Sequence, residues 1–207
     1  TKHFVANDSE FERNTINSVV PERALREIYL APFEAVVKEA QAWGIMAAYN
    51  RIDGEYACEN EKILNQILRE EWGFDGVVVS DWFATRSTTK SIEAGLDLEM
   101  PGPVSHYGEK IVEAVNSGEL DEEIVNSSVH RLLLLLERTG AFEEPLQVPE
   151  RELDNPDDKI LVRKAAAESM VLLKNDGLLP IELKETETIA LIGPNAATAM
   201  IMGGGSA

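Results

Sequence analysis

Residues 76–82 read Gly-Val-Val-Val-Ser-Asp-Trp, and this stretch decides the fold. Its valines form a short apolar run that turns polar at the C-terminal end, as strands buried on both faces of a parallel sheet do. Residues 44–50, Gly-Ile-Met-Ala-Ala-Tyr-Asn, repeat the pattern. Between them, residues 60–72 carry apolar side chains at helical spacing, with Asn60 as an N-cap and Gly73 as a stop. The sequence therefore predicts a strand–helix–strand unit.

The same alternation continues on both sides of this unit. Strands are predicted over residues 2–6 and 96–100, a long amphipathic helix over residues 21–42 and a short helix over residues 88–94. Four successive βα units imply a parallel sheet, either open or closed into a barrel. Polar groups at the C-terminal ends of the strands favour the barrel, because the active sites of such barrels lie on that face.

Four units make only half of a (β/α)₈ barrel, which takes about 250 residues when complete. A lone half-barrel would expose two sheet edges and an open core face, so we expect it to be unstable by itself. The fold expected for the first region is the second half of a TIM-type (β/α)₈ barrel. An upstream portion or a partner chain would complete it.

A second domain is predicted beyond the barrel segment. Residues 143–158 carry three prolines and many acidic side chains, which is typical of a linker. They separate the barrel segment, residues 1–142, from residues 159–207, where a second α/β domain begins. The elements expected around the linker are helices over residues 106–116, 121–139 and 159–174, and a buried strand over residues 188–193.

The charge of the chain limits its partners. With 19 basic against 37 acidic residues, the 207-residue chain has a net charge of −18, which opposes binding to nucleic acid or anionic lipid. Neither nucleic acid nor a membrane is expected as a partner, and the apolar run at residues 132–136 is far shorter than the roughly 20 residues of a spanning helix. Cys58 is the only cysteine, so the chain can form neither an intrachain disulfide nor a thiolate-rich metal site.

Asp81 is the first candidate for chemistry. It follows the valine run directly, so its carboxylate would stand at the mouth of the barrel, with Trp82 beside it as a flat apolar face. This pairing suits a sugar, whose C–H faces pack on an aromatic ring while its hydroxyls need polar partners. The alternative is structural, with Asp81 as the N-cap of a helix and Trp82 in the core.

Other residues near strand ends each have a structural alternative. Lys2 and His3 could donate to sugar hydroxyls and keep a nearby carboxylate ionised, or they could be a surface lysine and a core histidine. Met46 and Tyr49, taken alone, are better interpreted as core and rim packing residues.

Two acids, Asp97 and Glu99, alternate with apolar residues in the last predicted strand. Both would share one face of that strand, where burial is costly unless the carboxylates are hydrogen-bonded or functional. A position at the edge of the barrel mouth fits them equally well.

Several motifs follow one another along the chain. They are Lys2-His3-Phe4, Met-Ala-Ala-Tyr-Asn at 46–50, Val-Ser-Asp-Trp at 79–82, Gly-Leu-Asp-Leu-Glu-Met-Pro-Gly at 95–102, Glu-Ser-Met-Val-Leu-Leu-Lys-Asn at 168–175, Leu-Leu-Pro at 178–180, Ile-Gly-Pro-Asn-Ala at 192–196 and Gly-Gly-Gly-Ser-Ala at 203–207. In their order and intervals they resemble glycoside hydrolase family 3, and the resemblance covers essentially the whole chain. The order of the motifs argues against chance.

The resemblance implies a TIM-type barrel followed by an (α/β)₆ sandwich, and a retaining β-glucosidase that acts by double displacement without a metal or organic cofactor. The family's nucleophile is the aspartate of its Ser-Asp-Trp motif, which corresponds to Asp81. The sequence around Asp81 and the Gly-Gly-Gly-Ser-Ala motif at residues 203–207 are most similar to members with a PA14 insertion in the second domain. The residues that would line the sugar-binding subsite are Lys2, His3, Met46, Tyr49 and Trp82.

Parts of the family's active site have no counterpart in this chain. No residue matches the general acid, a glutamate further into the second domain, or the Asp and Arg that bind the sugar from the first half of the barrel. Residues 5–8, Val-Ala-Asn-Asp, differ from the His-containing loop of members that cleave N-acetylglucosaminides, which disfavours that branch.

The expected partner is a β-glucoside or oligosaccharide substrate, and a homo-oligomer is left open. Two functions of other classes also stay open. One is a Schiff-base aldolase that uses Lys2 as its amine nucleophile. The other is a truncated, non-catalytic carbohydrate-binding fragment.

Overall fold

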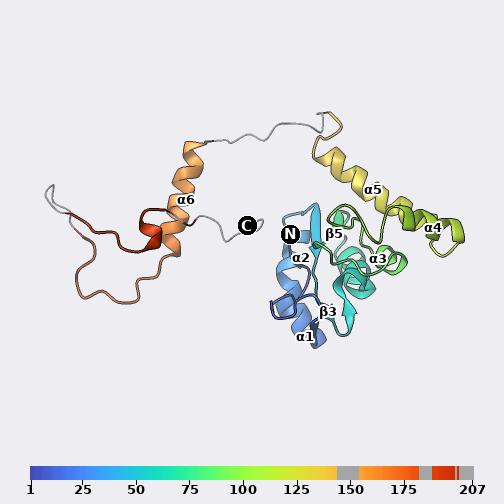
Figure 1. Cartoon of the computed structure of the whole chain (residues 1–207), viewed down its shortest axis with the longest axis horizontal. Helices are drawn as coiled ribbons and strands as arrows, with labels where there is room; N and C mark the ends of the chain where they lie inside the picture. Colours follow the sequence, from blue (N-terminus) through green and yellow to red (C-terminus); the bar gives the residue numbers. More distant parts are fainter. Residues whose placement is uncertain (144–153, 182–187, 199, 201–207) are drawn as a thin grey trace. The chain divides into compact units, whose positions relative to one another are not determined.

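The computed structural model describes residues 1–143, 154–181, 188–198 and 200 (Figure 1). The chain divides into two units, Thr1–Pro149 and Glu150–Ala207. Among the helices described, none has the length and apolar character that crossing a membrane requires.

A parallel pair of strands forms the centre of the first unit. β2 (Gly44–Ala47) and β5 (Val77–Ser80) pair residue for residue. Phe4 forms a parallel bridge beside β2, and Leu98 forms another beside β5. The four predicted strand regions therefore lie side by side, parallel and in the predicted order.

The two outer segments are less regular than predicted. Residues 2–6 and 96–100 each make a single parallel bridge rather than a strand. Within the described residues, each has a strand partner on one side only, and φ of Ala6 is +59°, which turns the chain out of the extended conformation. β2 also ends at Ala47 and not at residue 50, because the chain turns there into a second, smaller sheet.

This small sheet was not predicted. β3 (Arg51–Ile52) pairs antiparallel with β4 (Glu55–Tyr56) and parallel with β1 (Asn17–Ser18). The two turn residues between β3 and β4, Asp53 and Gly54, both have positive φ, as a type I′ hairpin turn requires. The Asp-Gly pair is a recognisable hairpin signal in the sequence.

The predicted helices of the first unit form, with ends that differ by a few residues. Asn60 lies at the start of its helix as expected, because its side-chain oxygen accepts a hydrogen bond of 3.0 Å from the backbone N–H of Ile63. Gly73, with φ of +72°, follows the end of that helix. The helices are α1 (Glu22–Ala24), η1 (Leu25–Leu30), α2 (Ala31–Lys38), η2 (Ala57–Glu59), η3 (Lys62–Glu71), α3 (Thr89–Glu93), α4 (Glu109–Ser117) and α5 (Glu122–Arg138).

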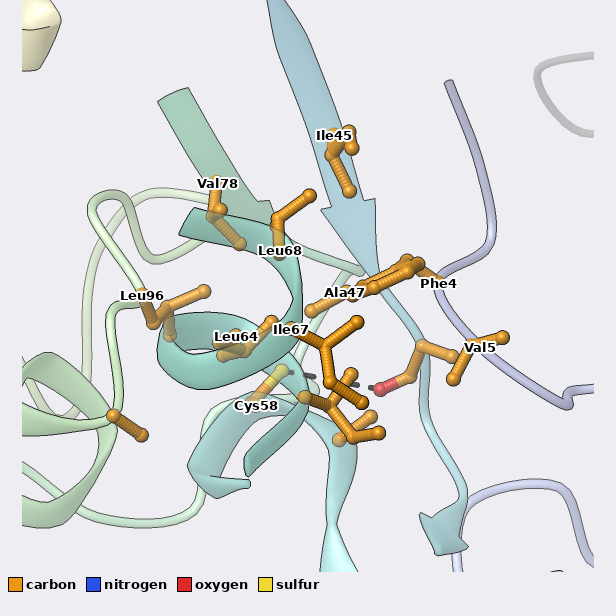
Figure 2. Close-up of a cluster of buried hydrophobic side chains, with 14 of the residues drawn as sticks. Phe4, Val5, Ile45, Ala47, Cys58, Leu64, Ile67, Leu68, Val78 and Leu96 are labelled. Carbon is orange, nitrogen blue, oxygen red and sulfur yellow. Dashed lines mark hydrogen bonds between the residues drawn. The ribbon is translucent and has the colours of Figure 1, made fainter. Parts of the chain in front are cut away.

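Helix η3 supplies the centre of the core. Figure 2 shows Leu64, Ile67 and Leu68 of η3 beside Ile45 of β2 and Val78 of β5. All five side chains are buried. The predicted strand–helix–strand unit is thus the part of the sequence that builds the core.

Cys58 belongs to the same core. It is fully buried, and its thiol lies 3.9 Å from the carbonyl oxygen of Ala48 (dashed line in Figure 2). Burial raises the pKa of Cys58 to about 12. The side chain therefore stays a neutral thiol and packs as a small apolar group.

Asp97 joins two helices to the sheet through a buried ionic cluster. Its carboxylate lies 2.7 Å from Nη2 of Arg69 in η3 and 2.8 Å from Nε of Arg131 in α5. It also accepts a hydrogen bond of 2.8 Å from the backbone N–H of Val78 at the start of β5. Of the roles considered for this acid, the structure favours the hydrogen-bonded, structural one.

Glu99 organises the loop that follows the Leu98 bridge. Its carboxylate accepts hydrogen bonds from the backbone N–H groups of Ser105, His106 and Tyr107, at 3.2, 3.0 and 2.8 Å. Burial by itself would raise the pKa of Glu99, but these hydrogen bonds outweigh it and hold the pKa below the usual value. The ionised carboxylate therefore stabilises the fold of residues 101–108.

Replacing Glu99 with glutamine is expected to remove an acid-sensitive part of the stability. Because the folded-state pKa lies below the usual 4.5, this contribution is fully present above that pH and is lost as the pH falls through the folded-state pKa. Denaturant unfolding of the complete enzyme should give a larger free energy of unfolding for the wild type than for Glu99→Gln at neutral pH. This difference should shrink in acid. Glu113→Gln, on the exposed face of α4, is the control, and an advantage independent of pH would contradict the prediction.

Among its described residues, the second unit contains one long helix, and the strand predicted there does not form. α6 (Pro156–Ser169) overlaps the predicted helix of residues 159–174 but is shifted toward the N-terminus. It begins at Pro156 because the side chain of Asn155 accepts a hydrogen bond from the N–H of Asp157 and proline suits the first helical position. Residues 188–193 form no strand and are exposed, since no described segment pairs with them. The short η4 (Pro194–Ala196) follows. Residues 144–153 of the predicted linker and the 203–207 motif lie outside the described residues.

Candidate active site

Asp81 stands where β5 ends. Its backbone N–H donates a hydrogen bond of 3.0 Å to the carbonyl of Ala47, so the carboxyl ends of β2 and β5 meet at this residue. Its side chain is buried, and Oδ1 accepts a hydrogen bond of 2.8 Å from the backbone N–H of Trp82. Oδ2 is also buried but has no hydrogen-bond partner among the described residues. One carboxylate oxygen is thus held in place while the other keeps its acceptor capacity.

The structural alternative for Asp81 and Trp82 is wrong. No helix begins after Asp81, because the chain forms a turn there and α3 starts only at Thr89. Trp82 is 53% exposed and does not belong to the core. An exposed indole beside a buried carboxylate is the arrangement that the sugar-binding hypothesis requires.

His3 lies close to the Asp81 carboxylate. Its Nε2 is 3.5 Å from Oδ2, close enough for charge attraction but without hydrogen-bond geometry. Lys2, the preceding residue, is exposed.

Tyr49 lies beside Asp81 from the other strand end. It follows β2 and is half-buried against the core. Burial raises the pKa of Tyr49, and the neighbouring Asp81 carboxylate raises it further. The phenol therefore stays protonated and can act as a donor. Met46 lies within β2 on the face opposite to the buried Ile45 and Ala47.

A cavity of about 330 Å³ extends the site and adds residues that the sequence analysis missed. The guanidinium of Arg13 lies 4.9 Å from the ring centre of Tyr49. Arginines in loops that follow predicted strands were a usable signal, because those loops form the mouth of a barrel. The lining residues are Arg13, Asn14, Tyr49, Trp82, Phe83 and Arg86.

Asn50 holds two of the site segments together. Its buried side-chain amide donates to the carbonyls of Val5 and Ala6 and to the hydroxyl oxygen of Ser18, each at 3.2 Å. The segment that carries His3 is thereby fixed against the end of β2. This positioning residue was named in a motif but not predicted as part of the site.

The structure brings some of the predicted residues together and not others. His3 and Tyr49 neighbour Asp81, and Tyr49 and Trp82 share the cavity. Lys2 and Met46 make no recorded contact with Asp81 in the described part of the chain. The same part contains no group of three or more His, Cys, Asp or Glu side chains arranged to hold a metal ion.

A larger cavity, of about 510 Å³, lies elsewhere. Its lining includes Trp43, which precedes β2, and Phe74 and Asp75, which precede β5. It therefore lies at the N-terminal ends of the strands, opposite to Asp81. The active sites of such barrels lie at the C-terminal ends of the strands, so this cavity is not the candidate site.

Comparisons with known proteins agree over the whole chain. Residues 1–135 match the model of the glycosyl hydrolase family 3 N-terminal domain, and residues 170–207 match that of its C-terminal domain. A β-glucosidase of Rhizobium radiobacter is 57% identical over 206 residues, which are 100% of this chain and 25% of the relative. A probable β-glucosidase I of Neosartorya fischeri is 48% identical over 207 residues, 100% of this chain and 24% of the relative. The chain spans about a quarter of the length of these curated relatives.

Solved structures give the same result. A GH3 β-glucosidase of Bifidobacterium adolescentis matches 86% of this chain with 26% of its own, at 39% identity and a TM-score of 0.77. β-Glucosidase 3B of Thermotoga neapolitana in complex with α-D-glucose matches 87% of this chain with 26% of its own, at 39% identity and a TM-score of 0.79. These neighbours have a TIM-barrel domain followed by an α/β sandwich.

Proposed function

The chain belongs to glycosyl hydrolase family 3, and from this premise we propose that it forms part of a retaining β-glucosidase in which Asp81 is the nucleophile. The observation that carries the proposal is the Asp81 carboxylate itself. It is buried at the carboxyl end of a parallel strand, with one oxygen held by the N–H of Trp82 and the other without a hydrogen-bond partner among the described residues.

The proposed reaction is a double displacement on a terminal β-D-glucoside. The free oxygen of Asp81 attacks the anomeric carbon while a general acid protonates the departing oxygen, and water then hydrolyses the glycosyl-enzyme with retention of configuration. In retaining enzymes the two carboxyl groups are about 5–5.5 Å apart. The acid is proposed to lie outside this chain.

The neighbours of Asp81 have distinct proposed roles. His3, 3.5 Å from the carboxylate, lies within reach of a bound sugar hydroxyl, and the protonated Tyr49 donates toward the carboxylate or toward the sugar. Trp82 offers its exposed ring to the C–H face of the glucose. Lys2 and Met46 complete the proposed sugar-binding set.

The proposed domain arrangement supports this function. Residues 1–142 would form the C-terminal half of the barrel, residues 143–158 a linker and residues 159–207 the start of the sandwich domain. The division of the structure between Pro149 and Glu150 and the separate matches of the two family models support the arrangement.

A comparison of chain lengths tests the function. The complete enzyme should hydrolyse 4-nitrophenyl β-D-glucoside and release β-glucose first, as NMR of the fresh product would show. The isolated segment of residues 1–207 should show negligible turnover, because it lacks the acid and half of the barrel. Inversion by the complete enzyme, or ordinary glycosidase turnover by the segment, would contradict the proposal.

The two other functions are distinguished in the same preparations. A Schiff-base lysine is usually activated by desolvation, whereas Lys2 is exposed, so no observation favours the aldolase. Borohydride trapping of a carbonyl substrate on Lys2 would instead support the aldolase. Glucose binding by the complete protein without turnover would instead support a carbohydrate-binding role.

A further inference from the structure

The 330 Å³ cavity is lined only in part by residues proposed to hold the sugar. Its lining shares Tyr49 and Trp82 with the sugar-binding set but does not include Lys2 or His3. At about 330 Å³, it lies at the lower end of the sizes of small-molecule sites. The lining residues outside the sugar-binding set, among them Phe83 and Arg86, are therefore the candidates for contact with the leaving group.

Two aromatic side chains that line the cavity are exposed. Trp82 is 53% exposed, and Phe83 is 71% exposed. Phe83 also has φ of +64°, a backbone conformation that is costly for a residue with a bulky side chain. Strain that turns an apolar ring toward solvent suggests that the ring contacts a ligand.

Arg86 provides a positive charge with a fixed position in the same cavity. One guanidinium nitrogen donates a hydrogen bond of 3.1 Å to the carbonyl of Asn14, and the guanidinium carbon lies 5.0 Å from the ring centre of Tyr56. Within the described residues, Arg86 forms no ion pair. Most of its five N–H donors therefore stay available to a ligand.

Arg13, the other arginine of the cavity, differs in this respect. Its Nη1 lies 2.7 Å from Oε2 of Glu10, so its charge is partly compensated. The chain as a whole has a net charge of −18, so an uncompensated arginine in this cavity is a local exception. An anionic group would be attracted to Arg86 at short range against the overall repulsion.

We propose that Arg86, together with the exposed rings of Trp82 and Phe83, selects β-glucosides whose leaving group is an aromatic ring bearing a carboxylate. The aromatic rings would pack against the leaving group, and the guanidinium would bind the carboxylate, a geometry for which arginine is well suited. The inference rests on the proposed function, because it assigns the leaving-group side of the same site.

A pair of substrates matched in shape tests the inference. The complete enzyme is assayed with 4-carboxyphenyl and 4-carbamoylphenyl β-D-glucoside, and the ratio of the two kcat/KM values is compared between variants. Arg86→Gln should lower the carboxylate-to-amide ratio at least about tenfold, because it removes a charge-assisted hydrogen bond. Using the ratio cancels differences in leaving ability and any general loss of activity. Arg86→Lys keeps the charge and should retain part of the ratio.

Arg23→Gln is the matched control, because Arg23 is an exposed arginine on α1 paired with Glu27 and outside the cavity. It should leave the ratio unchanged. Inhibition supplies a second measurement: 4-hydroxybenzoate should inhibit the wild type more strongly than 4-hydroxybenzamide, and Arg86→Gln should remove the difference.

An unchanged ratio in Arg86→Gln, or an equal decrease in Arg23→Gln, would overturn the inference. If the enzyme still hydrolysed the neutral substrate, the proposed function would stand. Wild-type enzyme that hydrolysed neither substrate nor 4-nitrophenyl β-D-glucoside would overturn the proposed function, and the inference with it.

Discussion

Replacing Asp81 with asparagine or alanine is expected to reduce β-glucosidase activity of the complete enzyme by about 10⁴-fold or more, as loss of a covalent nucleophile does. An amide can accept the hydrogen bond from Trp82 but cannot form the glycosyl ester. The fold should survive, because the side chain of Asp81 makes only that one hydrogen bond among the described residues. The thermal midpoint of Asp81→Asn should stay the same or rise, since a buried carboxylate oxygen without a partner is itself costly.

Chemical trapping identifies the residue directly. A 2-deoxy-2-fluoro-glucoside slows hydrolysis of the intermediate, so an ester should accumulate on the peptide that contains Asp81 and be readable by mass spectrometry. Azide should partly rescue Asp81→Ala by attacking from the vacated face, with a product of inverted configuration.

Asp75→Asn is the control for a carboxylate near the same strand, because Asp75 lies before β5 at its other end and pairs with Arg138. It should leave turnover unchanged. Near-normal turnover in Asp81→Asn, or a label on Asp97 or Glu99, would show that Asp81 is not the nucleophile even though the family stands.

Replacing Asp97 with alanine is expected to cost about 3–5 kcal/mol of stability, the range for breaking a buried ion pair. The carboxylate is fully buried, and its two arginine partners are 13% and 19% exposed. Burial already lowers the pKa of Arg69, and Asp97 opposes that effect. Without Asp97, both guanidinium groups and the N–H of Val78 would lose their partner in the interior.

Denaturant unfolding of the complete enzyme, followed by a probe in the barrel domain, measures the loss. Asp75→Ala is the control, because its pair with Arg138 is solvent-exposed and such pairs contribute little. A similar small effect for both variants would mean that the Asp97 cluster does not join the helices to the sheet as the structure indicates.

The elements that the sequence predicted best are those whose pattern repeats within a few residues. The valines before Asp81 form an apolar run buried on both faces, and the apolar spacing of η3 buries one face, so local patterns were enough to predict β5, η3 and the capping role of Asn60. The hairpin at Asp53 and Gly54 also carries a local signal, which was overlooked.

The elements that are less regular than predicted, or absent, depend on partners distant in the sequence. Residues 2–6 and 96–100 pair in the predicted positions but only as single bridges, and residues 188–193 form no strand, because the hydrogen bonds of a strand come from neighbouring segments. No pattern within the segment itself contains that information.

For the site, the sequence by itself determined the chemistry of one residue. Asp81 follows a buried run and precedes a tryptophan, and the motif order placed both in a known family. Whether that carboxylate is buried, near a histidine or free to accept was not contained in the order of residues. Those properties follow from contacts between segments.

The tertiary structure alone decided which side chains surround Asp81. His3 and Tyr49 approach Asp81 from two other segments, and Arg86, from the loop after β5, shares a cavity with Tyr49. They come together because parallel strands bring their carboxyl ends to the same edge of the sheet. Asp97 and Asp81 lie in similar sequence surroundings, yet two arginines neutralise the first while no cation forms a hydrogen bond with the free oxygen of the second among the described residues. Sequence patterns report burial along one segment, whereas the charge and hydrogen-bond partners of a buried group come from other segments, and only folding brings those together.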